Sequence, residues 1–215
     1  MMFKRDQVTI EDTWHVSGLR GTGSHHYQVS NAFVPEGRSV VMGGRGRFER
    51  PLYQFPMLGL LAMGVSSVSL GIGWRALDAF KELADTKVPT GAVKGLASRS
   101  QVQALVAEAT ADLLSSQAFI RDVIGEAWQI AERGDRLPVE SKARLRLAAA
   151  NATARAVHAV DQLYQAGGGS SIYEDSVLQR CFRDVHVTTQ HLMVARPIFE
   201  VVGRVELGME PGSMV

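Results

Sequence analysis

The segment from Pro51 to Trp74 contains no charged side chain. A helix of this composition is buried in protein or in lipid, and its length would allow it to cross a membrane. It also holds Gln54, Pro56, three serines and four glycines, however, and small residues let neighbouring helices approach closely. We therefore expect a central helix of a helical bundle and no membrane span.

Helical patterns continue to the end of the chain. Apolar residues at helical spacing, interrupted by Gly and Pro, predict four helices over about residues 52–85, 98–133, 138–167 and 176–207. Ser176 and Gln179 are expected to start the fourth helix as a capping box. Because the connections are short, neighbouring helices should run antiparallel. The expected fold class is mainly α, with an antiparallel up-down four-helix bundle domain over 52–215.

Residues 1–40 have a different character. Partly alternating segments at 7–16 and 25–34, rich in β-branched and aromatic residues, flank a turn-rich stretch and predict two strands. Two strands do not form a stable sheet alone, so we expect the terminal hairpin of an incomplete β domain. Its open edge should pair with another chain, fold onto the bundle or fray. Residues 41–51, which include a glycine-rich run, are expected to form the linker.

Composition excludes several functions. The net charge of +1 gives no reason to expect nucleic acid or an anionic membrane as a partner. The single cysteine, Cys181, forms no internal disulfide and fits a buried thiol in the cytoplasm. His25 and His26 have no carboxylate or thiol partner at ligand spacing, and no Glu-x-x-His motif occurs, so no metal site is expected.

Two segments have features of an anion site. Gln165 is followed by Ala166 and three glycines, Gly167, Gly168 and Gly169, where a helix cap would need only one. Exposed backbone N–H groups in such a loop can hold a phosphate or a flavin edge. The second segment is Ser98–Arg99, where a helix N-terminus beside a cation can hold a phosphate, although a simple cap with a solvated arginine explains it equally well.

The fourth predicted helix carries a further candidate. Asp184, Thr188 and His191 would share one helix face, and a histidine there can donate a hydrogen bond or take a proton near neutral pH. The alternative is a histidine bonded inside the bundle. His186 falls on another face and is expected at the surface. Arg180, Arg183 and Asp184 are expected to form surface ion pairs.

The stretch DTWHVSGLRGTGSHHYQVSNAFVPEGRS, residues 12–39, resembles the end of the β domain in the acyl-CoA dehydrogenase superfamily. There, a W-x-x-x-G-L/M-R-G-T-G-S/T pattern and a later F-V-P lead into a helical bundle. The resemblance covers nearly the whole chain but only the C-terminal half of the family's fold. The segment RDVHVTTQH, with no acidic residue between Asp184 and Glu200, resembles the flavin-dependent monooxygenase branch.

The resemblance implies an oxidoreductase that takes reduced flavin, FMN more than FAD, from a separate reductase and transfers one oxygen atom of O₂ to a bulky aromatic substrate. It makes His191 the active-site histidine and the Gln165–Gly169 loop a contact to the flavin of a neighbouring subunit. It implies that the Arg-Asp pair holds its helix against its neighbours. It also implies a homo-oligomer, dimer or tetramer, with a site that is incomplete in this chain and is completed by an N-terminal half, which a separate chain can carry.

Two alternatives remain open from the sequence. One is a fragment of an FAD-dependent acyl-CoA dehydrogenase, which the missing acid after Asp184 argues against. The other is a non-catalytic helical partner that assembles with a full-length paralogue.

Overall fold

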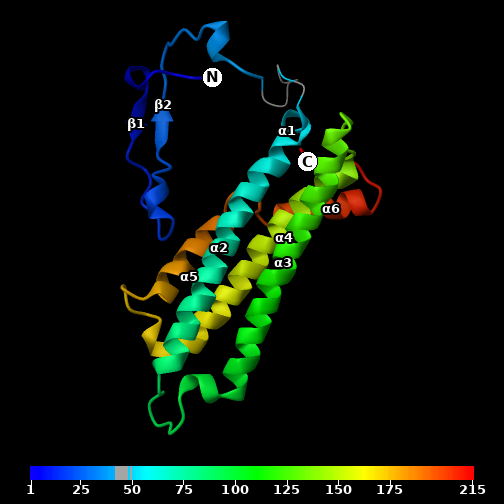
Figure 1. The fold of residues 1–215 in the computed structure, drawn as a ribbon. Helices are drawn as coiled ribbons and strands as arrows, with labels where there is room; N and C mark the ends of the chain where they lie inside the picture. The colour runs from blue at the N-terminus through cyan, green and yellow to red at the C-terminus, as the bar shows by residue number, and fades with distance from the viewer. Residues whose placement is uncertain (42–47, 49) are drawn as a thin grey trace.

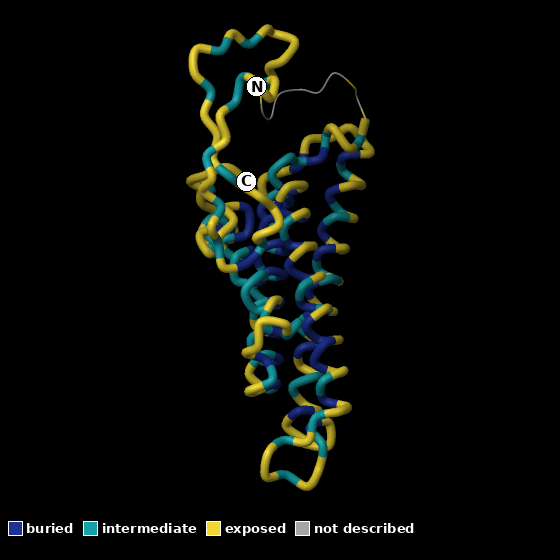
Figure 2. The backbone as a smooth tube through the Cα atoms, turned by 90° about the vertical axis from the view of Figure 1, so that its left-hand side faces the viewer, coloured by how far each residue is buried: buried dark blue, intermediate teal, exposed yellow. Residues whose placement is uncertain are grey.

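The computed structural model of the protein describes residues 1–41, 48 and 50–215. The helices are α1 (Pro51–Gln54), α2 (Met57–Thr86), α3 (Ser100–Glu132), α4 (Val139–Gly167), α5 (Val177–Thr188) and α6 (Pro197–Glu206). The long helices α2, α3 and α4 stand side by side, the short α1 precedes α2, and α5 and α6 lie along and across the long helices (Figure 1). Buried residues run the length of the long helices (Figure 2). The predicted helical bundle, preceded by a hairpin, is confirmed.

The uncharged segment forms α1 and most of α2. By length and composition α2 is the one helix of the described chain that is able to cross a membrane. In the fold it packs against α4 and α5, and Ala62, Leu77 and Phe80 are fully buried. A Cβ on Gly73 would lie 2.6 Å from Leu113 Cδ2, so this glycine lets α3 approach α2 closely. These contacts support the interpretation of α2 as a bundle helix.

The prediction of one continuous fourth helix over residues 176–207 is wrong. The segment divides into α5, which ends at Thr188, and α6, which begins at Pro197, with turns between them. The hydroxyls of Thr188 and Thr189 each donate to a backbone carbonyl three residues earlier, at 2.6 Å, which competes with continued helix. Proline suits the first position of a new helix because it has no N–H to donate. The expected capping box is also absent, because Ser176 makes no side-chain cap bond.

Polar side chains inside the bundle bond to each other. The Ser69 hydroxyl of α2 donates to Thr188 Oγ1 of α5 at 3.0 Å, and Thr153 of α4 donates to Ser69 Oγ at 3.3 Å. These bonds give the buried hydroxyls polar partners from neighbouring helices. Cys181 is also buried, as expected, and burial raises the pKa of its thiol, which keeps it protonated and unreactive.

The N-terminal hairpin is shorter than the sequence indicates. Strands β1 (Thr9–Glu11) and β2 (His26–Gln28) pair antiparallel, with Ile10 opposite Tyr27. The hairpin stands beside the bundle rather than inside it (Figure 1), and its residues are largely exposed. The predicted linker, residues 41–51, falls mostly outside the described residues.

The connection between β1 and β2 rests on α5. The Leu19 N–H donates to Asp184 Oδ1 at 2.7 Å, and Arg183 Nη1 donates to the Ser17 carbonyl at 3.2 Å. A Cβ on Gly18 would lie 2.4 Å from the Arg183 carbonyl oxygen, so only glycine fits. The expected ion pairs of Asp184 with Arg180 and Arg183 do not occur among the described residues. Arg183 and Asp184 instead bond the Ser17–Leu19 segment.

Replacing Asp184 with alanine should release the Ser17–Thr22 connection from α5. A hydrogen bond to a charged group contributes about 1.5–3 kcal/mol, so exchange of the Leu19 amide hydrogen should accelerate by roughly 10- to 100-fold. Because the contact is local, the melting temperature of the bundle should change little. Hydrogen exchange measured by NMR tests this, with Asp184→Asn, which keeps an acceptor oxygen, as the control. Unchanged exchange at Leu19 would show that other contacts hold the connection.

Candidate functional site

The three successive glycines at the end of α4 have different surroundings. A Cβ on Gly167 would lie 2.1 Å from Ser171 Oγ and 3.0 Å from Leu178 Cδ1, so close packing excludes any side chain there. Gly168 has a φ of +56°, which favours glycine. A Cβ on Gly169 would meet nothing within 4 Å. The fold therefore requires Gly167 and Gly168, whereas Gly169 leaves its backbone open to solvent or a ligand.

Lys87, which the sequence analysis did not single out, anchors this loop. Its Nζ donates to the Gly167 carbonyl at 2.6 Å and to Ser170 Oγ at 2.9 Å. An ammonium group has three donors, so one remains for a further acceptor. A single lysine just beyond a helix gives no local signal of such a contact. The contact arises because α2 and α4 run in the same direction and end side by side (Figure 1).

Arg99 belongs to the same end of the bundle. The backbone carbonyl of Lys87 accepts a hydrogen bond from the Leu96 N–H at 2.8 Å, which fixes the turn that leads into α3. Helix α3 begins at Ser100, slightly later than predicted, with the exposed Arg99 at its N-cap position. Both predicted phosphate-binding segments are thus tied to Lys87, one through its side chain and one through its backbone.

The groups at this end suit a phosphate. Lys87 has one donor left and Ser170 has a hydroxyl, and both lie beside the exposed Gly169, where no side chain restricts access to the backbone. Arg99 adds a second cation. Gln165 is exposed on the last turn of α4, and its carbonyl accepts the Gly168 N–H. The residues present therefore fit the phosphate of a flavin.

The sequence predicts His191 on a helix. In the structure it lies instead in the turn between α5 and α6. The chain leaves helical geometry at Thr188, so Asp184, Thr188 and His191 do not line one groove: Thr188 points into the core, and Asp184 bonds the Leu19 N–H. The His191 side chain is exposed, and its Nδ1 accepts the Met193 N–H at 3.2 Å. A neutral imidazole with Nδ1 as acceptor carries its proton on Nε2. His191 can therefore present an Nε2–H donor to a ligand.

The two candidate regions of one chain lie far apart. The glycine loop precedes α5, and His191 follows it. Helix α5 has 12 residues, which at about 1.5 Å per residue separates its ends by roughly 18 Å. One copy of the described chain does not bring His191 and the glycine loop together.

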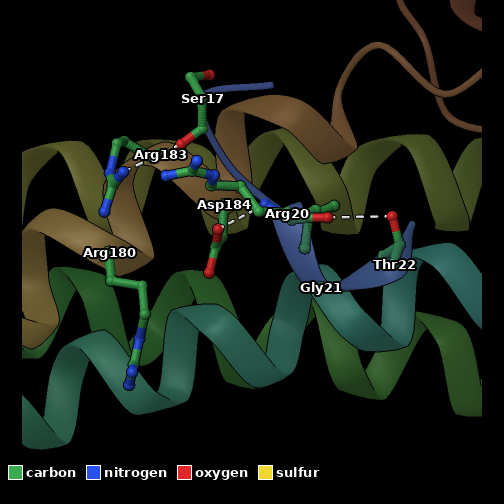
Figure 3. A pocket seen from close by; sticks show the side chains of 8 residues that line it. Ser17, Arg20, Gly21, Thr22, Arg180, Arg183 and Asp184 are labelled. Atoms are coloured by element: carbon green, nitrogen blue, oxygen red, sulfur yellow. Dashed lines mark hydrogen bonds between the residues drawn. The ribbon is translucent and has the colours of Figure 1, made fainter. Parts of the chain in front are cut away.

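A pocket of about 390 Å³ opens between the Leu19–Thr22 segment and α5. Figure 3 shows Asp184 with Arg180 and Arg183 to one side of it and with the segment that carries Arg20 on the other. Three guanidinium groups and one carboxylate line this pocket, so it carries net positive charge and can accept an anionic group. No local sequence pattern indicates this pocket, because Arg20 comes from a segment far from α5 in the chain.

His186 is less free than a surface position implies. Its Nε2 lies 2.8 Å from Asp161 Oδ1 on α4, and its ring contacts that of Phe182 at a centroid distance of 4.6 Å. The side chain is 42% exposed. His186 thus links α5 to α4, and its surroundings indicate a structural role. Among the residues that the structure describes, no three His, Cys, Asp or Glu side chains gather as a metal site would require.

The glycine loop allows a matched test. Gly167→Ala places a methyl group against Ser171 and Leu178, and overpacking of this kind should lower the free energy of unfolding by about 1–3 kcal/mol. Gly169→Ala meets no atom, so its effect should stay within about 0.5 kcal/mol. Chemical denaturation of the two variants measures both values. Equal effects would contradict the distinction between a packed and an open glycine.

Comparison with known proteins agrees with this architecture. Residues 63–196 match the family model described as "Acyl-CoA dehydrogenase, C-terminal domain". The chain is 34% identical over 207 residues to an indole-3-acetate monooxygenase of Pseudomonas putida, covering 96% of this chain and 53% of that protein. It is 31% identical over 220 residues to the oxygenase component of a p-hydroxyphenylacetate 3-hydroxylase of Acinetobacter baumannii, covering 96% and 51%.

A solved structure shows the same arrangement of elements. XiaF from Streptomyces sp., in complex with FADH2 and glycerol, superimposes with a TM-score of 0.88 at 26% sequence identity, covering 97% of this chain and 55% of that one. The chain therefore spans about half the length of the relatives it matches. The helical bundle, the hairpin before it and the match over residues 63–196 show that the chain belongs to the acyl-CoA dehydrogenase C-terminal domain family.

Proposed function

We propose that this chain is the C-terminal part of a flavin-dependent monooxygenase, the oxygenase component of a two-component system that hydroxylates a bulky aromatic substrate. The observation that carries the proposal is the turn between α5 and α6. It presents an exposed histidine whose Nδ1 is held by the Met193 N–H, and it contains no carboxylate. The relatives in Pseudomonas and Acinetobacter support the same assignment, because both are named as enzymes that add oxygen to an aromatic acid.

Reduced flavin, FMN or FAD, would supply the electrons that activate O₂. Lys87, Gly169 and Ser170, with Arg99 nearby, are the residues that we assign to its phosphate. We assign to His191 one of two roles. Its Nε2–H donates a hydrogen bond to a reacting oxygen, or Nε2 takes the proton of a phenol after it has lost its own proton. A separate flavin reductase is the partner that such an oxygenase component requires.

The separation of roughly 18 Å along α5 favours a cofactor site built from two copies of the chain. In that arrangement the glycine loop of one copy holds the phosphate of a flavin whose reacting end lies near His191 of another. A remaining N-terminal region, in the same or another chain, would supply the other walls of the site.

The chief alternative is a dehydrogenase that oxidises an acyl thioester. That reaction removes a proton from carbon and needs a base. Residues 185–199 contain no acidic side chain, and the turn exposes an imidazole. These features favour the monooxygenase, and no feature of the described residues favours a purely non-catalytic partner.

The test of function is a chimera in which this chain replaces the matching half of the Pseudomonas putida enzyme. With a flavin reductase and indole-3-acetate, we expect hydroxylated product. His191→Ala should reduce turnover by about 100-fold or more, the scale of a lost acid–base group. Product analysis and single-turnover kinetics measure the effect.

His186→Ala is the matched control for this experiment. It removes the bond to Asp161, so it should lower the melting temperature, but turnover per folded molecule should persist. If the His191 and His186 variants have equal activity at equal folded concentration, His191 has no chemical role. A folded chimera that binds flavin and forms no product would favour the non-catalytic alternative.

We further propose that the chain self-associates through the exposed apolar face of α2. Leu60, Leu61 and Val68 are 48%, 45% and 50% exposed on a helix whose opposite face packs into the bundle. Light scattering at high micromolar concentration should show a dimer or tetramer. Leu61→Glu should shift the population to monomer, whereas Leu114→Glu, at an exposed position on α3, should not. A monomeric native chain would contradict this surface.

A further inference from the structure

Arg146 is an unusual residue in the core of the bundle. It lies on α4, is only 3% exposed, and makes no ion pair among the described residues. Burial lowers the pKa of its guanidinium, but the ordinary value is so high that the group stays charged. A buried cation without a carboxylate partner is costly. Its position therefore calls for a reason other than packing.

Within the described residues, the side-chain hydrogen bonds of Arg146 go to the turn that carries His191. Its Nη2 lies 3.5 Å from the Leu192 carbonyl oxygen and 3.4 Å from the Met193 carbonyl oxygen. Both contacts are long and are shared by one nitrogen, so attraction between the charge and the two carbonyl dipoles contributes most. The Nε of Arg146 has no partner in the described part of the chain.

One peptide group connects Arg146 to His191. The carbonyl of Leu192, which faces the guanidinium, belongs to the same peptide unit as the Met193 N–H, which donates to His191 Nδ1. A cation at the oxygen end of a peptide polarises it and makes its N–H a stronger donor. A stronger donor at Nδ1 favours the tautomer in which the proton sits on Nε2.

We propose that Arg146 is a positioning residue that sets the tautomer of His191 through the Leu192–Met193 peptide. It keeps Nδ1 as an acceptor and Nε2–H directed outward, toward substrate or cofactor. The consequence for catalysis rests on the proposed function, but the tautomer itself does not.

A merely structural role predicts a different outcome. If Arg146 served only to fill space, an unbranched apolar side chain of similar length would replace it without loss. Exchange of buried charges for apolar residues is often neutral or stabilising. Arg146→Met should therefore fold, with equal or higher stability. The His191 imidazole of this variant should nevertheless no longer favour the Nε2–H tautomer.

The experiment uses the full chain, labelled with ¹⁵N, without flavin or substrate. At alkaline pH, where the imidazole is neutral, the nitrogen chemical shifts of His191 report how its proton is divided between Nδ1 and Nε2. The chain has six histidines, so the His191 signals are assigned by their loss in His191→Asn. The native chain should show mainly the Nε2–H form.

In Arg146→Met the ratio of Nε2–H to Nδ1–H should fall roughly threefold to tenfold, the effect of weakening about one hydrogen bond. Arg146→Lys keeps a charge but loses the guanidinium fork, so its ratio should lie between the two. The control is Arg144→Met, which removes the same charge two residues away, where the arginine bonds Glu126 and Asp122 at the surface. Its ratio should equal that of the native chain.

An unchanged ratio in Arg146→Met overturns the proposal, whatever the stability of that variant. So does an equal fall in Arg144→Met, because the effect would then be a general one of net charge. If Arg146→Met does not fold, a native ratio in Arg146→Lys also overturns the proposal. If the Nε2–H to Nδ1–H ratio falls in Arg146→Met and the chimera is inactive, the proposed function is rejected but the role of Arg146 is supported.

Discussion

The close packing of α2 against α4 is the constraint on which the rest of the structure depends. Both helices bury many small residues, and Gly59 and Gly73 of α2 lie against Leu145 and Ala156 of α4. Small side chains let two long helices approach closely and gain dispersion contacts along their length. Because one antiparallel helix intervenes in the sequence, these two helices run parallel and end together.

This shared end explains the glycine loop. Lys87 follows the last residue of α2, and Gly167 is the last residue of α4, so the lysine meets the loop without any long connection. The same residue holds the turn before α3 through its backbone. A cation, a hydroxyl and an open backbone are therefore placed by helix packing, and the loop itself needs little stability of its own.

The opposite end of α5 depends on a different kind of contact. There the turn that carries His191 is held from α4 by a buried guanidinium, while Thr188 joins a chain of hydroxyl groups at the end of the helix. Buried polar groups are costly unless they are satisfied, so they restrict the turn to few arrangements. The two parts of the proposed site thus lie roughly one α5 length apart, and this geometry is suited to a site assembled between copies.

The amino-acid sequence determined the class of the fold. Apolar periodicity and the Gly and Pro residues between helices located α2, α3 and α4, because these signals act over a few residues. The sequence also pointed to the glycine loop. Tertiary structure decided the rest. The chain left helical geometry after Thr188 and resumed it at Pro197, which produced the His191 turn, and the packing of distant segments brought Lys87 to Gly167 and Arg146 to Leu192. Such contacts depend on where helices end relative to one another, and no local pattern records that distance.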